Sequence, residues 1–194
     1  MATKITIIDG HPDPDPGRLC HALAEAYAKG ALEAGHDIRR IDVARLEFPI
    51  LRTQHAFDKE TPVPDIQTAQ DDILWADHIV IVYPLWLGTM PALLKAFLEQ
   101  TMRPGFAFEE GGNGWPRQRL QGRTARIVVT MGMPAFFYRW YFLAHSLRSL
   151  ERNILRFCGI KPAGETIFGM VDAAGDAKRA KWLAKMTDLG RRGH

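Results

Sequence analysis

The chain has 194 residues, of which 46% are hydrophobic and 24% are charged, and its formal net charge is +3. This length and composition exclude a disordered or fibrous protein and predict one domain, residues 1–194, with a full hydrophobic core. No apolar run approaches the ~20 residues of a membrane span, so we expect no integral membrane segment. Because the N-terminus leads directly into Ile5-Thr6-Ile7-Ile8, we also expect no cleaved leader.

The cysteines and the basic residues narrow the class of protein further. Cys20 and Cys158 both lie among apolar neighbours in helical patterns, which favours buried free thiols in a reducing compartment and predicts a cytoplasmic location. Most of the C-terminal lysines and arginines decorate one helix. Without a nucleic-acid-binding motif this pattern is typical of a solvated face, so we expect no nucleic-acid partner. The histidines outside the loops described below show no metal-ligand spacing, and we predict no metal site.

Residues 4–9 predict a first strand, which runs into a loop at residues 10–18 before a helix begins near Leu19. A loop at this junction directs the first amides of the helix away from the sheet, so a phosphate is the expected ligand. Prolines and aspartates in the loop weaken that case. The amides of Gly17, Arg18 and Leu19 and the guanidinium of Arg18 remain as donors.

The most informative stretch begins with a strand of four consecutive β-branched residues, 79–82, which predicts burial on both faces. From Pro91 onward, apolar residues recur at helical spacing up to Met102. An aromatic, proline-bounded loop, residues 83–88, lies between them. In an open parallel sheet such a loop lies where ligands bind, so we interpret Tyr83 and Trp86 as a wall for a flat, apolar ligand. The alternative is a loop that packs into the core.

The remaining segments complete an alternating pattern of strands and helices. We predict a second strand at 37–43, a long loop without periodicity at 44–65 that covers a site or a neighbouring subunit, and a short helix at 66–76. A glycine-rich excursion at 103–115, a strand at 126–130 and a second aromatic loop at 131–141 follow. The last predicted elements are a helix ending at Gly159, a strand at 165–170 and a basic helix.

Five strands alternating with helices predict an α/β fold, a doubly wound five-stranded parallel sheet in a three-layer sandwich. The strand order 2-1-3-4-5 fits best. In that order the loops at 10–18, 83–89 and 130–141 converge on one crevice.

Several motifs on these loops carry a family resemblance: Gly10-His11-Pro12, the run from Pro84 to Lys95, Gly105-Phe106-Ala107-Phe108, Thr130-Met131-Gly132 and Phe157-Cys158-Gly159. Over nearly its whole length the chain resembles the flavodoxin-like NAD(P)H dehydrogenase (quinone) family of NAD(P)H-dependent oxidoreductases, of the diaphorase type. The resemblance implies a flavodoxin-like fold and a tightly bound flavin, FAD or FMN.

The resemblance also assigns residues to the site. Those implied to hold the isoalloxazine ring are Pro84, Leu85, Trp86, Leu87 and Gly88 on one side and Thr130, Met131, Gly132 and Met133 on the other. His11, Gly17, Arg18 and Leu19 are implied at the phosphate end, although the chain has no Ser or Thr between His11 and Leu19. Tyr138, Tyr141 and His145 are the candidates for contact with the substrate.

The implied reaction takes electrons from NADH or NADPH and passes two of them to a quinone or a similar acceptor. We expect both substrates to use one slot in turn, roofed by residues 136–141, with ping-pong kinetics. We also expect a homodimer, because residues 44–65 and 136–142 offer more apolar surface than a soluble monomer exposes. A flavodoxin-type electron carrier is the alternative, but such carriers are usually strongly acidic. A regulatory flavoprotein subunit of a transporter is a further alternative.

Overall fold

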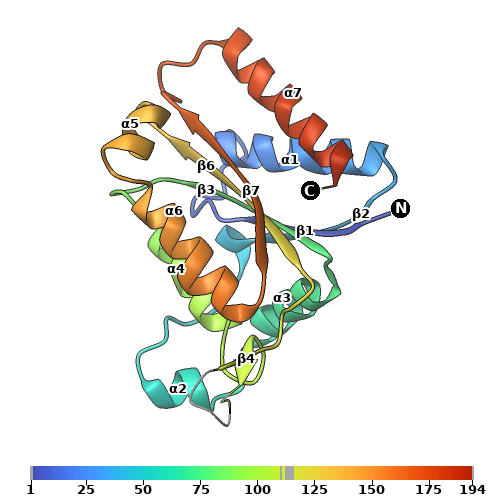
Figure 1. Cartoon of the computed structure of the whole chain (residues 1–194), viewed down its shortest axis with the longest axis vertical. Coiled ribbons are helices and arrows are strands. Elements are labelled where there is room, and N and C mark those ends of the chain that lie inside the picture. Colours follow the sequence, from blue (N-terminus) through green and yellow to red (C-terminus); the bar gives the residue numbers. More distant parts are fainter. Residues whose placement is uncertain (1, 110, 112–115, 194) are drawn as a thin grey trace.

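The computed structural model describes residues 2–109, 111 and 116–193. Its centre is a sheet of five parallel strands in the order β2-β1-β3-β6-β7, which confirms the predicted order 2-1-3-4-5 (Figure 1). The strands are β1 (Lys4–Asp9), β2 (Asp37–Asp42), β3 (His78–Pro84), β6 (Thr124–Met131) and β7 (Lys161–Gly169). A separate antiparallel pair joins β4 (Phe108–Glu109) to β5 (Arg117–Gln118).

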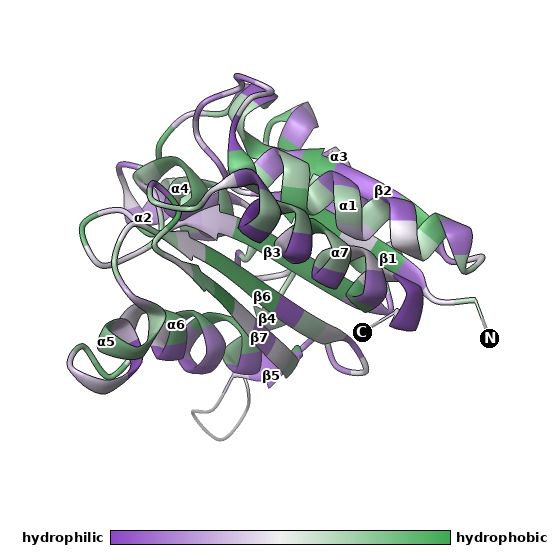
Figure 2. Cartoon of the chain, turned by 90° about the horizontal axis from the view of Figure 1, so that it is seen from above, coloured by the Kyte–Doolittle hydropathy of each residue, from purple (hydrophilic) through white to green (hydrophobic). Residues whose placement is uncertain are grey.

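Helices cover both faces of the sheet and make a three-layer α/β sandwich (Figure 2). One face packs against α1 (Leu19–Glu33) and α7 (Asp176–Arg192). The other packs against α3 (Pro64–Trp75), α4 (Ala92–Thr101), α6 (His145–Ser149) and its π-helical continuation η2 (Leu150–Arg156). The β-branched run of β3 alternates between the two cores, because Ile79 and Ile81 face one side while Val80 and Val82 face the other.

The helices α1 and α7 cross in backbone contact through two glycines. A methyl group added at Gly190 would overlap the carbonyl oxygen of Tyr27, and one added at Gly30 would overlap the carbonyl oxygen of Thr187. Only hydrogen fits at these two positions. This crossing fixes α7 beside α1, so both helices cover the same face of the sheet.

Three predicted segments differ in the structure. Residues 44–65 are not structureless, because they contain the end of η1 (Val43–Arg45), the helix α2 (Gln54–Asp58) and the first turn of α3. Their capping residues explain this. Thr53 Oγ1 accepts a hydrogen bond from the Ala56 amide, and Pro64 occupies the first turn of α3, where its missing N–H costs nothing.

The second aromatic loop contains α5 (Ala135–Trp140), which follows Pro134 beyond the carboxyl end of β6. The last strand, β7, begins at Lys161, four residues before the predicted start at 165, and pairs with β6 across an irregularity at Ala125/Arg126. Of the excursion at 103–115, residues 110 and 112–115 lie outside the described part. Among the residues that the structure describes, no helix combines the length and the apolarity needed to cross a membrane.

Candidate functional site

The carboxyl ends of β1, β3 and β6 open onto a cavity of about 440 Å³. We call this cavity the crevice. The predicted cofactor residues that line it are His11, Gly17, Arg18, Leu19, Pro84, Trp86 and Thr130. Leu85, Leu87, Gly88, Met131, Gly132 and Met133 belong to the same connections but lie outside its lining. The three predicted loops therefore meet at one place, as a doubly wound sheet requires.

The loop after β3 ends in a tight turn. The Trp86 amide donates to the Thr89 carbonyl oxygen at 2.8 Å, and the Thr89 amide donates back to Trp86 at 3.0 Å. The two central residues, Leu87 (φ 47°) and Gly88 (φ 81°), both have positive φ, as a type I′ turn demands. Within the described part of the chain, no acceptor takes the amides of Leu87 and Gly88. The turn thus presents two free N–H donors.

Leu87 is strained and fully exposed, with a relative exposure of 106%. A left-handed conformation costs an L-residue about 1–2 kcal/mol, and Leu87 makes no packing contact that offsets this. The other described non-glycine residues with positive φ, Leu143, Ala144 and Met170, also lie on connections that leave β6 and β7. Backbone strain therefore concentrates at this end of the sheet, which is typical of ligand sites.

The opposite wall of the crevice is tied to the turn through Thr130. The Leu85 amide donates to the Thr130 carbonyl oxygen at 2.7 Å, and the Thr130 hydroxyl lies 3.3 Å from the Cys20 thiol. Burial raises the pKa of Cys20 to about 12. Cys20 therefore stays a neutral packing group at the floor of the crevice rather than a nucleophile.

Residues after the last strand also enter the crevice, and the sequence analysis missed them. The amides of Met170 and Val171 donate to the carbonyl oxygens of Met133 and Met131. This pairing joins the connection after β7 to the connection after β6 and brings Asp172 and, from α7, Arg179 to the lining. The signal that could have found them is topological, because this connection leaves the same edge of the sheet as the other loops.

The loop at 10–18 neutralises much of its own positive charge. The Arg18 guanidinium forms ion pairs with Asp13 at 2.6 Å and Asp15 at 3.3 Å, and the Gly17 amide donates to Asp15 Oδ1. The Arg18 amide donates to the Asp15 carbonyl oxygen at 3.1 Å. Three of the four predicted phosphate donors are therefore engaged within the loop. However, α1 begins without a side-chain cap, so the first amides of the helix at Leu19 remain available to an anion.

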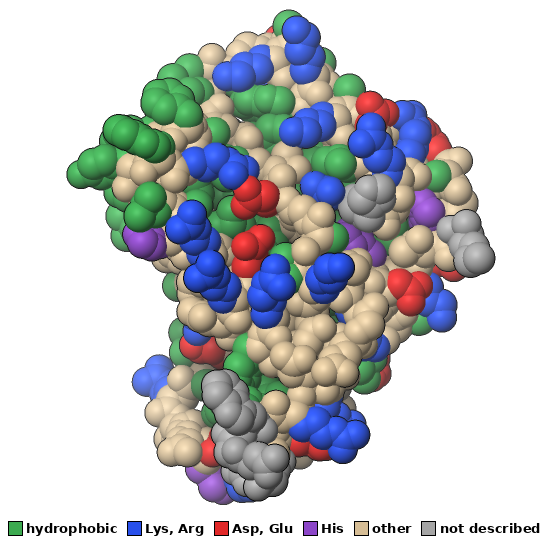
Figure 3. All heavy atoms as spheres, viewed as in Figure 1, with side chains coloured by type: hydrophobic (Ala, Val, Ile, Leu, Met, Phe, Trp, Pro, Cys, Tyr) green, Lys and Arg blue, Asp and Glu red, His purple; other side chains and the backbone are tan. Residues whose placement is uncertain are grey.

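The aromatic segment forms an exposed apolar surface. Phe136, Trp140 and Tyr141 are 71%, 79% and 64% exposed, and hydrophobic side chains gather at the upper left of Figure 3, in the region of α5 in Figure 1. The rings of Phe137 and Tyr141 are stacked, with their centroids 4.9 Å apart. This surface is larger than the scattered exposed side chains of an ordinary soluble monomer.

The three substrate-contact candidates have different environments. Tyr138 is buried, and its hydroxyl lies 2.7 Å from Ser146 Oγ and accepts from the Leu147 amide. The hydroxyl of Tyr138 is therefore occupied inside the core and joins α5 to α6, so this residue is a structural anchor. Tyr141 and His145 are exposed. The interpretation of Tyr83 as a ligand wall is wrong, since its side chain is fully buried at the end of β3.

A second cavity, also about 440 Å³, lies on the other side of Trp86 between α4 and α6. Its lining includes Trp86, Leu87 and Met90 together with Ser146 and Lys95. Trp86 lines both cavities and separates them. A larger cavity of about 730 Å³ lies between α2 and residues 104–109, 111 and 116, toward the opposite end of the molecule from α5 in Figure 1. In the described ranges, no cluster of three or more metal-ligating side chains occurs.

Comparison with known proteins matches most of the chain to one family. The family model described as a flavodoxin-like fold covers residues 3–189. A protein of Haemophilus influenzae, named an uncharacterized NAD(P)H oxidoreductase, is 29% identical over 195 residues, which cover 94% of this chain and 96% of that protein.

Two solved structures share the fold. The NAD(P)H:quinone oxidoreductase of Methanothermobacter marburgensis has a TM-score of 0.82 at 23% identity, covering 100% of this chain and 98% of that one. An FMN-dependent NADH-azoreductase of Bacillus anthracis in complex with FMN has a TM-score of 0.76 at 18% identity, covering 98% of both chains. At these identities the likeness establishes the fold.

Proposed function

Because this chain belongs to the flavodoxin-like family whose model spans residues 3–189, we propose that it is a flavin-dependent NAD(P)H oxidoreductase that passes two electrons to a quinone or a similar acceptor. A bound flavin supplies the redox chemistry, by taking a hydride from NADH or NADPH and returning two electrons to the acceptor, which also takes up two protons. The observation that carries the proposal is the strained turn at Leu87 and Gly88, whose two free amides directly follow Trp86 in the lining of a crevice built from three converging loops.

The protein groups fit such a cofactor. The amides of Leu87 and Gly88 would donate to the polar edge of the isoalloxazine ring, which favours the negative charge of the reduced ring. Trp86 gives the ring an apolar neighbour, and Thr130 lies on the opposite side of the crevice. His11 and the uncapped first turn of α1 would hold the phosphate end.

The extension of the crevice along α7 supports FAD rather than FMN. Beyond the loop at 10–18 the lining continues to Asp172, Arg179 and Leu183. A guanidinium suits a second phosphate, a carboxylate suits a ribose hydroxyl, and an apolar side chain suits adenine. Heat release of the yellow chromophore followed by mass measurement identifies the cofactor.

Arg179→Gln should then weaken FAD binding while leaving FMN binding unchanged, whereas Lys181→Gln, an exposed change on the same helix, should alter neither. Release of FMN from the native protein, or equal losses for both flavins in Arg179→Gln, would exclude the FAD assignment without excluding a flavin.

We further propose that NAD(P)H and the acceptor occupy one slot in turn, on the side of Trp86 that faces α5 and α6. Both are flat rings that must lie within roughly 3–3.5 Å of the flavin for hydride transfer, so they cannot bind together. The exposed, stacked pair Phe137 and Tyr141 and the exposed His145 are our candidates to cover this slot.

Initial-rate measurements test the shared slot. Reciprocal plots at several acceptor concentrations should give parallel lines, and Tyr141→Ala should raise KM for both NAD(P)H and the acceptor. Intersecting lines with a detectable ternary complex would contradict one slot. A Tyr141→Ala enzyme with both KM values unchanged would remove this residue from the slot.

The exposed aromatic surface on α5 also supports a homodimer as a proposal. Phe136 and Trp140 are the most exposed large rings on it, and burial of such a patch against a second copy would remove it from water. Light scattering at micromolar concentration should report about twice the monomer mass of 21.9 kDa. A mass near that of the monomer would contradict the dimer.

A further inference from the structure

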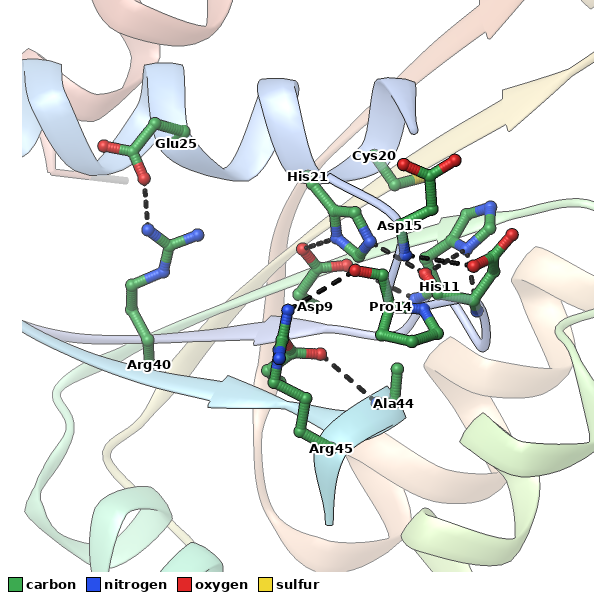
Figure 4. A network of polar contacts seen from close by, with 12 residues as sticks. Asp9, His11, Pro14, Asp15, Cys20, His21, Glu25, Arg40, Ala44 and Arg45 are labelled. Carbon is green, nitrogen blue, oxygen red and sulfur yellow. Dashed lines mark hydrogen bonds and ion pairs between the residues drawn. The ribbon is translucent and has the colours of Figure 1, made fainter. Parts of the chain in front are cut away.

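His21 lies directly beneath the loop at 10–18, and both of its ring nitrogens are engaged. Nδ1 lies 2.6 Å from Asp9 Oδ2, and Nε2 lies 2.9 Å from the carbonyl oxygen of Asp13 (Figure 4). The side chains of His21 and Asp9 are only 14% and 7% exposed. This pair therefore joins the first turn of α1 to the carboxyl end of β1 and to the loop.

The geometry fixes the protonation of His21. A carbonyl oxygen and a carboxylate oxygen can only accept, so both ring nitrogens of His21 must carry hydrogen, and the ring is an imidazolium. Burial acts to lower the pKa of His21, but the hydrogen bonds to Asp9 and Asp13 outweigh it, and the pKa is raised. The raised pKa and the two acceptors around the ring therefore both indicate a protonated His21.

The pKa of His11 shifts in the opposite direction. Its Nδ1 lies 3.1 Å from the amide nitrogen and 3.2 Å from the carbonyl oxygen of Asp13, so this ring is also held by the loop backbone. Burial is the main cause that lowers the pKa of His11, and the charge of His21 adds to it. The two ring centroids are 5.4 Å apart. Burial and the charge of His21 therefore both favour the neutral form of His11, which lines the crevice.

Asp13 connects this pair to the rest of the loop. Its carbonyl accepts from His21, its amide donates to His11, and its carboxylate binds the Arg18 guanidinium. The loop contains no Ser or Thr whose hydroxyl could hold an anion. The contacts that His21 makes from below therefore add to the ion pairs and hydrogen bonds within the loop that hold its conformation.

The charges around His21 balance only when it is protonated. Asp9 faces it from β1 with its carboxylate, whereas Asp13 presents only its carbonyl oxygen and pairs its carboxylate with Arg18. The His11 ring faces it from the loop, and Asp42 at the end of β2 is paired with Arg45. Arg40, which lines the same small cavity of about 190 Å³, is paired with Glu25. If His21 lost its proton, the buried carboxylate of Asp9 would remain without a counter-charge beside the crevice.

We propose that Asp9 and His21 are positioning residues for the phosphate end of the flavin: the His21 imidazolium holds the loop at 10–18 in its anion-binding form and cancels the Asp9 charge behind it. This inference rests on the proposed function, because the ligand is the phosphate of a flavin. The pair takes the place of a loop hydroxyl, and Arg18 cannot replace it, since that guanidinium is already paired with Asp13 and Asp15.

The pair also makes phosphate binding depend on pH. The pKa of His21 in the folded protein is raised above its ordinary value of 6.5. The stabilising contact between the His21 imidazolium and Asp9 is therefore fully present below pH 6.5, and it is lost as the pH rises through the raised pKa. A flavin phosphate gains charge near pH 6, which strengthens its attraction to cations. A decline in phosphate affinity with rising pH would therefore come from the titration of the protein and not from that of the flavin phosphate.

The test compares two probes that differ only in the phosphate. The dissociation constants of FMN and riboflavin are measured by flavin fluorescence, across pH, for the wild-type apoprotein, His21→Gln and the control His55→Gln, whose side chain is 74% exposed. We expect His21→Gln to weaken FMN binding by about ten- to a hundredfold and to leave riboflavin binding unchanged. The FMN affinity of the wild type should decline with rising pH more than that of His21→Gln.

Equal losses for FMN and riboflavin, or identical pH profiles for wild type and His21→Gln, would overturn the inference. A wild-type apoprotein that binds neither probe would instead overturn the proposed function. Nitrogen NMR of the histidine rings gives a readout that needs no flavin and no variant. Two protonated nitrogens on His21 near neutral pH support the inference, and a neutral His21 ring contradicts it.

Discussion

Leu87 offers the sharpest prediction, because its strain and its exposure have opposite consequences for the free protein and for the complex. Leu87 has φ 47° and is fully exposed. Replacement by glycine, Leu87→Gly, removes a strain of about 1–2 kcal/mol. Glycine also adds about 0.5–1 kcal/mol of conformational entropy to the unfolded chain. The balance is a flavin-free protein that is more stable by about 0.5–1 kcal/mol, or roughly 1–4 °C in Tm for a chain of this size.

Binding should change in the other direction. If the Leu87 side chain packs against the flavin, its removal loses most of the burial of a leucine, about 1.5–3 kcal/mol, which corresponds to a roughly 10- to 150-fold weaker complex. Leu87→Ala separates the two effects, because alanine keeps the strain but loses most of the side chain. It should weaken binding without stabilising the free protein.

Thermal unfolding of the apoproteins and flavin fluorescence titrations measure both quantities. Leu143→Gly is the matched control, because Leu143 has φ 51° and lies outside the lining of both cavities beside Trp86. Because Leu143 is only 46% exposed, loss of its side chain also removes buried apolar surface, so this variant controls for binding alone and should leave flavin binding unchanged. A destabilised Leu87→Gly apoprotein, or one that binds flavin as the wild type does, would refute the reasoning.

Two further predictions concern the scaffold. Gly190→Ala inserts a methyl group into the backbone contact between α1 and α7 and should destabilise the protein by about 3 kcal/mol or more, or roughly 6–12 °C in Tm. The control Gly175→Ala lies at the start of the same helix, where open space surrounds the added methyl group, and should change Tm little. Equal Tm values for the two variants would contradict the close crossing. Cys20 and Cys158 are each 1% exposed, and burial raises the pKa of each thiol to about 12. Neither thiol should therefore react with an alkylating reagent at pH 8 until the protein is unfolded. Rapid labelling of the native protein would contradict this prediction, because it would show that one of the thiols is accessible.

Sequence patterns alone predicted the fold and the meeting of three loops at one edge of the sheet. The unbroken β-branched run at 79–82 could only be a strand covered on both faces, and the alternation of strands and helices then left few topologies. The family model confirms the predicted flavodoxin-like family, and the Haemophilus influenzae relative is named an NAD(P)H oxidoreductase. Convergence of the loops at 10–18, 83–89 and 130–141 followed from the strand order, because the carboxyl ends of parallel strands meet at one edge.

Properties that depend on side-chain direction could not be predicted. Tyr83 and Tyr138 are aromatic residues next to the site in sequence, but the pleat of β3 and the α5–α6 connection turn both rings into the core. Arg179 enters the crevice only because the glycine crossing fixes α7 against α1. The ion pair of Asp9 and His21 joins a strand to a helix, and no spacing rule links those two positions.

The most direct test of the account is a pair of anaerobic additions to the purified, flavin-loaded protein. NADH or NADPH should bleach the visible flavin absorbance within the time of one turnover, and a quinone added afterwards should restore it fully, with one equivalent of each substrate consumed per flavin. A protein that binds neither FAD nor FMN, or a bound flavin that NADH and NADPH both fail to reduce, would contradict the assignment of this crevice to an NAD(P)H-dependent flavoenzyme.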